Sequence, residues 1–87
     1  MRERYGLAAF RSRTQVLRLE ARLRQLGIPA QTVTTPRAVS MGCGLSVRFP
    51  PEHIQAVRGA IRAGGSENLI GLYLAEADGG KLRLRRA

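Results

Sequence analysis

The residue with the greatest chemical potential in this chain is Cys43, its only cysteine, which lies between Gly42 and Gly44. A glycine on either side keeps bulk away from the sulfur and gives the backbone a freedom that other residues lack. A thiolate is the nucleophilic form of cysteine, and nearby cations stabilise it. The stretch 35–45 therefore predicts an accessible thiol that a second molecule can reach. One alternative stays open, because a lone cysteine can also be an inert residue at the entry of a strand.

Other catalytic and metal-binding constellations are missing from the sequence. The six acidic residues are scattered, so no pair of carboxylates suggests general acid–base catalysis. His53 has no second histidine or partner cysteine to complete a metal site. The glycine pairs at 42/44 and 64/65 match no full phosphate-binding fingerprint. We therefore expect a protein that is not an enzyme acting alone and that uses neither a cofactor nor a metal.

Hydrophobic periodicity indicates the elements that must position Cys43. Residues 5–10 are short and mostly apolar, as in a strand buried on both faces. Ser12 followed by Gln15 indicates a capping box that begins a helix. Gly27 and Pro29 end that helix. Its predicted buried face consists of apolar residues at helical spacing, namely Val16, Leu19, Leu23 and Leu26.

The second half of the chain repeats this order of elements. In sequence, the pattern predicts a strand at 30–35, a strand at 45–49, a helix that begins at 50–52 and a strand at 69–77. Asp78-Gly79-Gly80 indicates a turn, after which residues 81–85 alternate between charged and apolar. This tail predicts either an additional edge strand or a frayed terminus.

The order strand, helix, strand, strand, helix, strand predicts an α+β sandwich of the ferredoxin-like βαββαβ type. It has a four-stranded antiparallel sheet and both helices on one face. The length favours a single domain over residues 1–87, with a core at about 5–77 and a basic tail or edge strand at 78–87. In this topology, Cys43 and the start of the first helix lie at the same end of the sheet.

That placement predicts a site that favours negative charge. A helix begins with unpaired N–H groups and a positive dipole end, and Arg37 adds a cation from the loop itself. Together they are expected to lower the pKa of Cys43 and to accept a small anion. The residues expected to stabilise the thiolate or bind the anion at the helix start are Arg11, Ser12, Arg13 and Thr14.

The chain is strongly basic, with a formal net charge of +9 and Lys81 as its only lysine among fifteen basic residues. This charge suggests an acidic partner such as nucleic acid or an acidic protein. A GC-rich genome, which favours arginine, alanine and glycine codons, would account for it equally well. No apolar run approaches the roughly 18 residues of a membrane span, and no secretory pattern follows the start. We expect a cytoplasmic protein with no membrane partner, whose single cysteine stays reduced.

Three stretches carry a recognisable pattern: Phe10–Leu17, Leu26–Pro29 and Thr35–Phe49. The most specific part is a Pro-Arg pair at 36–37, a short spacer and Cys-Gly at 43–44 before an apolar strand. Together they resemble the selenium/sulfur carrier-like family of small bacterial proteins over most of the chain, from about residue 5 to residue 73. The chain departs from that family's pattern in its arginine content and in the tail after residue 78.

The resemblance implies that Cys43 is the carrier atom, that Pro36 and Arg37 are the motif's proline and arginine, and that Ser12 is its helix-start serine. It implies a carrier whose partners are sulfur or selenium donor and acceptor proteins. Two alternatives stay open. The arginine-rich surface could make this a non-catalytic module that binds nucleic acid or an acidic protein. An exposed strand edge could also pair with itself in a homodimer.

Overall fold

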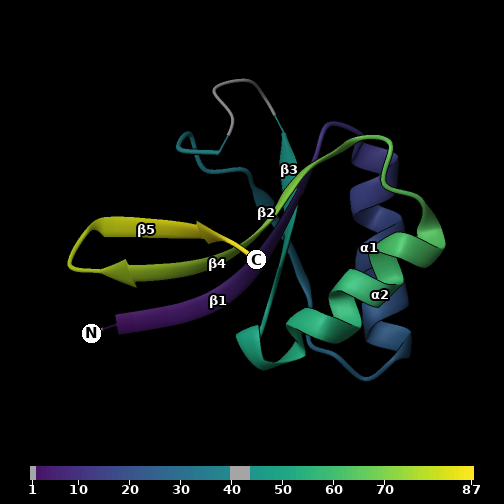
Figure 1. The fold of residues 1–87 in the computed structure, drawn as a ribbon, viewed down its shortest axis with the longest axis horizontal. Helices are drawn as coiled ribbons and strands as arrows, with labels where there is room; N and C mark the ends of the chain where they lie inside the picture. The colour runs from purple at the N-terminus through teal and green to yellow at the C-terminus, as the bar shows by residue number, and fades with distance from the viewer. Residues whose placement is uncertain (1, 40–43) are drawn as a thin grey trace.

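The computed structural model describes residues 2–39 and 44–87, so the expectations for Gly42 and Cys43 fall outside the described residues. Two helices and five strands follow one another along the chain (Figure 1). In order they are β1 (Arg2–Phe10), α1 (Arg13–Gln25), β2 (Gln31–Thr34), β3 (Leu45–Phe49), the short 3-10 turn η1 (Pro51–His53), α2 (Ile54–Gly64), β4 (Leu69–Asp78) and β5 (Lys81–Arg86). None of the described helices is long and apolar enough to cross a membrane.

The strands form one antiparallel sheet in the order β2-β3-β1-β4-β5. The predicted α+β class and antiparallel sheet are confirmed; the sheet has five strands where four were expected, because the tail forms the additional edge strand, one of its two predicted outcomes. The sheet has a fifth strand because Gly79 and Gly80 both adopt positive φ angles, 56° and 84°. A two-residue turn of this hand matches the twist of a hairpin and pairs β5 with β4, so the tail forms a strand instead of fraying.

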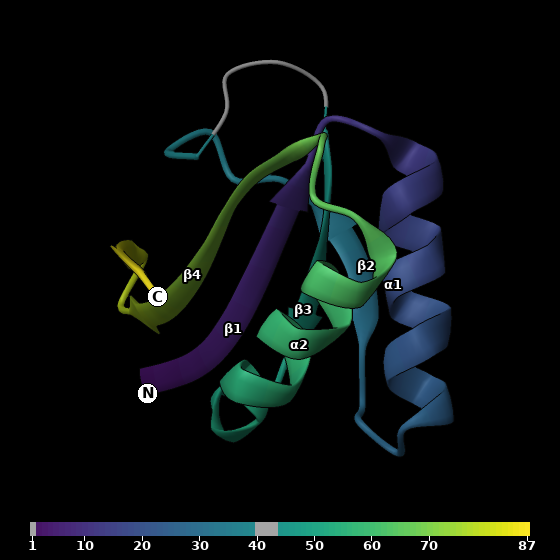
Figure 2. The same cartoon turned by 45° about the vertical axis from the view of Figure 1, so that its right-hand side comes forward.

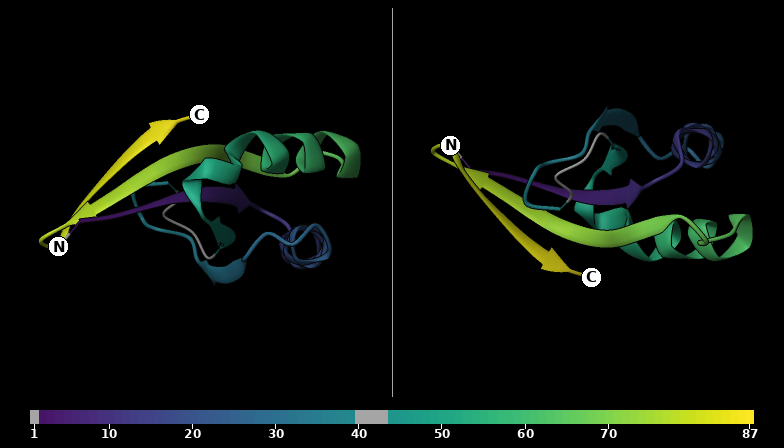
Figure 3. Two further views of the ribbon diagram at one scale, coloured as in Figure 1. Left: turned by 90° about the horizontal axis from the view of Figure 1, so that it is seen from below. Right: turned by 90° about the horizontal axis from the view of Figure 1, so that it is seen from above.

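The central strand β1 is longer than residues 5–10, which were expected to form it. Its first residues continue the ladder with the end of β4, where Arg2 lies opposite Asp78 and Arg4 lies opposite Glu76. Because their side chains are charged, this part of the strand does not belong to an apolar run and was not predicted from the sequence. The β4–β5 hairpin and the start of β1 therefore extend the sheet away from the helices (Figure 3).

The two helices lie on the same side of the sheet (Figures 1 and 2). They bury a core whose largest members are Phe10, Leu23 and Phe49. Gly6 makes room for this packing, because a Cβ at residue 6 would lie 2.1 Å from the Phe49 ring. A second, smaller cluster lies on the helix-free face around Leu7. Alternate residues of β1 thus pack into the helix-side core and into the cluster on the opposite face, as expected for a strand buried on both faces.

The end of α1 corrects one expected core residue. Leu26 is half exposed, because it is the residue at which the helix ends. Ile28 takes its place in the core, with its N–H bonded to the carbonyl of Leu23 at 2.9 Å. Gly27, at φ 79°, donates to the carbonyl of Arg24 at 3.0 Å. These two bonds form a Schellman motif, which requires the left-handed conformation that glycine adopts readily.

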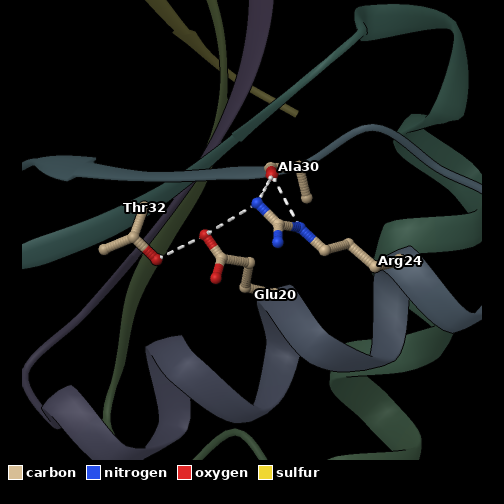
Figure 4. A network of polar contacts seen from close by, with 4 residues as sticks. All are labelled: Glu20, Arg24, Ala30 and Thr32. Carbon is tan, nitrogen blue, oxygen red and sulfur yellow. Dashed lines mark hydrogen bonds and ion pairs between the residues drawn. The ribbon is translucent and has the colours of Figure 1, made fainter.

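A polar network then fixes β2 against α1 (Figure 4). The Arg24 guanidinium donates to the carbonyl of Ala30 through Nε and Nη2 at 3.3 and 3.2 Å. The Thr32 hydroxyl donates to Glu20 Oε2 at 2.8 Å, and this carboxylate lies 4.0 Å from Arg24. The start of β2 is therefore held by contacts from the helix.

Candidate functional site

The described part of the cysteine loop begins and ends at a closed stem. The Thr35 N–H donates to the carbonyl of Gly44 at 3.0 Å, one step beyond the last β2–β3 pair, Thr34 with Leu45. The backbone on either side of the loop is therefore held together at the sheet. Gly42 and Cys43 themselves lie outside the described residues.

Two buried hydroxyl groups cross-link this stem. Thr35 Oγ1 and Ser46 Oγ lie 2.7 Å apart, in residues that are 5% and 0% exposed. A buried hydroxyl without a partner would cost free energy, so each of these groups satisfies the other. Sequence reasoning missed this pair, because the contact depends on the register between β2 and β3. The available signal was a serine between two apolar residues of the strand, Leu45 and Val47.

The structure leaves little room for a side chain at Gly44. A Cβ at this position would lie 3.2 Å from Thr35 Oγ1 and 3.7 Å from the carbonyl oxygen of Phe10. The first distance is tighter than an ordinary Cβ contact and the second is an ordinary one. Gly44 therefore leaves room for the Thr35 side chain beside it.

The proline-arginine pair starts a tight turn at the beginning of the loop. The Val39 N–H donates to the carbonyl of Pro36 at 2.9 Å, which closes the turn around Arg37. Arg37 is exposed. Val39 packs against the cluster around Leu7 and Tyr73 on the helix-free face of the sheet. Residues 36–39 thus lie against the face opposite the helices, a contact that the sequence pattern did not indicate.

The turn between β1 and α1 contributes the predicted helix start. Ser12 caps α1, and its Oγ accepts the N–H of Gln15 at 3.4 Å. The reciprocal half of a capping box is not formed: Gln15 Oε1, which would accept the Ser12 N–H, has no hydrogen-bond partner among the described residues. Gln15 Nε2 donates to Glu67 Oε2 at 3.3 Å. The Arg11 N–H donates to the carbonyl of Asn68 at 2.8 Å. This turn is therefore held from the segment that precedes β4.

The described ends of the cysteine loop, at Thr35 and Gly44, lie at the same end of the sheet as the start of α1 (Figure 1). Leu45 lies opposite Phe10 in the register, and Gly44 is adjacent to the Phe10 carbonyl. Arg11, Arg13 and Thr14 are exposed there, and Ser12 is half-buried. Within residues 2–39 and 44–87, no carboxylate lies within ion-pair distance of Arg11, Arg13 or Arg37. This end of the sheet therefore presents arginines that no described carboxylate neutralises.

His53 lies at the opposite end of the sheet. It ends η1, which follows the Phe49 end of β3, whereas the loop precedes the Leu45 end. The strand thus separates the histidine from Gly44, as the predicted topology requires. Within the described part of the chain, no group of three histidine, cysteine or acidic residues could hold a metal ion.

Fold and site together define a small α+β domain in which the connection between β2 and β3 contains the single cysteine and leaves and re-enters the antiparallel sheet at one end. The sequence profile of a family described as "Putative Se/S carrier protein-like" matches residues 5–69, and the chain belongs to this family. Comparison with curated proteins and with solved structures found no match. The matched region contains the cysteine loop and the start of α1, but it ends where β4 begins and excludes β5.

Proposed function

We propose that this protein carries sulfur or selenium on Cys43 between a donor and an acceptor protein. The observation that supports this most strongly is the family match across the cysteine loop, since Cys43 is the only residue of the chain with a thiol. The closed stem at Thr35 and Gly44 fits a carrier, because it gives a reactive loop a fixed base on the sheet. We also infer that β1 to β4 with the two helices form a ferredoxin-like unit to which β5 has been added.

The transfer needs no external oxidant or reductant. The Cys43 thiolate attacks the outer sulfur of a donor's cysteine persulfide, so that a new S–S bond forms on Cys43 and the donor leaves as a thiolate. An acceptor thiolate then attacks the outer sulfur on Cys43, which leaves as a thiolate in turn. The selenium reaction has the same balance. A free thiol is required, which suits a reducing compartment such as the cytoplasm.

The exposed arginines at this end of the sheet would favour the anionic forms. Arg37 and Arg11 would stabilise the thiolate before transfer and the persulfide after it. The start of α1 at Ser12, Arg13 and Thr14 would add the positive end of a helix dipole. Gly42 and Gly44 would leave the partner's active site room to reach the sulfur.

Intact-protein mass spectrometry tests the carrier function directly. The purified, reduced protein is incubated with a cysteine desulfurase and cysteine, with Cys43→Ser as the matched control. We expect a mass increase of one sulfur atom on the native chain, removable by a thiol reductant, and none on the variant. If the native chain gained no sulfur from several desulfurases and no selenium from selenocysteine-derived donors, the carrier function would be overturned.

A further inference from the structure

The strand β5 forms an exposed edge of the sheet. Within the described residues its only strand neighbour is β4. The Ala87 N–H donates to the carbonyl of Leu72 at 2.9 Å, which sets the phase of the antiparallel ladder. By that alternation, residues 81, 83 and 85 turn their backbone groups toward β4, and Leu82, Leu84 and Arg86 turn theirs outward. The edge therefore offers three successive sets of N–H and C=O groups to another strand.

The two faces of this edge strand carry different kinds of side chain. Lys81, Arg83 and Arg85 lie opposite Asp78, Glu76 and Leu74 and share the helix side of the sheet. Leu82 and Leu84 lie on the helix-free side, where Leu82 is 37% exposed and Leu84 packs against the small cluster. Arg86 shares the helix-free side and lies over the Tyr73 ring, 5.8 Å from its centroid. A strand added to this edge would therefore meet cations on one face, and two leucines followed by an arginine on the other.

The cationic face borders a recess of about 680 Å³ beside η1, lined by Arg4, Arg83 and Arg85 together with Pro51 and Leu74. Its one acid, Glu76, already pairs with Arg4 at 3.1 Å and with Arg2 at 3.5 Å. No carboxylate among the described residues lies within ion-pair distance of Arg83 or Arg85. The recess therefore has unneutralised positive charge directly beside the open edge, which favours acidic side chains there.

The same pattern disfavours pairing with a second copy of this chain. In a two-fold antiparallel pair both copies keep the same face upward, so odd-numbered residues of β5 lie opposite odd-numbered residues. Lys81, Arg83 and Arg85 would then face one another across the new ladder, and like charges in that position are destabilising. Charged edge strands commonly prevent such self-association.

We propose that the β5 edge binds an extended segment of a partner protein in which acidic and apolar residues alternate. The segment would extend the sheet by backbone hydrogen bonds, place its acids beside Arg83 and Arg85, and place its apolar side chains beside Leu82 and Leu84. This surface lies beyond residue 69, outside the region that the family profile matches. It does not depend on the carrier function, and Cys43→Ser leaves it intact.

Fluorescence anisotropy with a short labelled peptide of alternating glutamate and valine tests this site. We expect binding at low salt, with NMR shift changes concentrated at the amides of Leu82, Leu84 and Arg86. One matched peptide is N-methylated along a single edge and keeps its charge but loses the ladder bonds. A second has the same composition with the glutamates in one block. Both should bind about tenfold more weakly or worse.

Charge reversal on the protein provides the second half of the test. Arg83→Glu/Arg85→Glu should weaken binding by about tenfold or more, because two favourable pairs become repulsive. The control Arg18→Glu/Arg62→Glu makes the same change in net charge on exposed helix residues and should leave affinity within about twofold. Leu82→Pro removes an outward N–H without removing a bond to β4, and it should weaken binding with the hairpin intact by NMR.

Three results would overturn the proposal. The first is equal binding of the N-methylated and unmodified peptides. This comparison uses the native protein only, so it does not depend on whether a variant folds. The second is a dimer in sedimentation experiments at physiological salt that Leu82→Pro dissociates, which would assign the edge to a second copy. The third is salt-sensitive binding of a single-stranded oligonucleotide that depends on Arg83 and Arg85 while the peptide does not bind.

Discussion

The hydroxyl oxygens of Thr35 and Ser46 lie 2.7 Å apart at the base of the cysteine loop, and both residues are buried. Two neutral hydroxyl groups in this position have no access to water as an alternative partner. Their pairing therefore joins the end of β2 to β3 at the point where the loop leaves the sheet. It gives the connection between the two strands a defined base.

The losses from removing the two hydroxyl groups should not add. Thr35→Val or Ser46→Ala leaves a buried hydroxyl unpaired, which typically costs about 1–3 kcal/mol of unfolding free energy. In the double variant neither unpaired group remains, so its loss should be smaller than the sum of the single losses. Urea unfolding of the four proteins measures this coupling. Strictly additive losses would mean that the two hydroxyl groups do not act as a pair.

Glycine-to-alanine substitutions should distinguish glycines that are required for lack of space from glycines that are required for their backbone conformation. Gly44→Ala introduces a Cβ 3.2 Å from Thr35 Oγ1, so the stem must adjust. Gly27→Ala meets no atom within 4 Å but must hold a φ of 79°, at a cost of roughly 1 kcal/mol. Gly59→Ala meets neither obstacle within α2 and should stabilise by about 0.5–1 kcal/mol.

The measurement that distinguishes these glycines combines unfolding with NMR. Gly44→Ala should shift the amide resonances of the stem, Gly27→Ala should shift those at the end of α1, and Gly59→Ala should raise the melting temperature without altering either. A Gly44→Ala protein with an unchanged stem spectrum would refute the close packing of Thr35 against Gly44.

The packing of Phe49 over Gly6 gives a more severe prediction. A Cβ at residue 6 would lie 2.1 Å from the Phe49 ring, in a core where Phe49 is 2% exposed. Gly6→Ala should therefore destabilise by at least about 1–3 kcal/mol, as overpacking does. Gly6→Ala/Phe49→Leu relieves the clash and should recover part of this loss in urea unfolding. If the double variant recovered no stability, the loss in Gly6→Ala would not come from a clash with the Phe49 ring.

Much of the fold could be predicted from the sequence because its elements have simple periodicities. The helix 13–25, for example, has a cap at Ser12 and an end at Gly27, both of which are local signals. The charged start of β1 was missed because Arg2 and Arg4 pair with Asp78 and Glu76 far along the chain. No local pattern contains such long-range information.

The candidate site was predictable to a similar extent. Its placement at one end of the sheet follows from topology, and the Gly44–Phe10 approach agrees with it. The Thr35–Ser46 pair and the packing of Val39 on the helix-free face were not predictable. Both depend on the register of paired strands, which a one-residue change in loop length would alter.

The exposed arginines near the loop give the last prediction, which concerns reactivity. If Arg37 and Arg11 stabilise the Cys43 thiolate, then Arg37→Gln and Arg11→Gln should each slow its alkylation by iodoacetamide at constant pH, and the double variant should slow it further. The control Arg22→Gln removes one exposed charge from the last turn of α1, at the far end of that helix from Arg11, and should not change the rate. Added salt should reduce the difference between native and variant proteins, because exposed charges are screened. An unchanged rate in the double variant would mean that Arg37 and Arg11 do not influence the reactivity of Cys43.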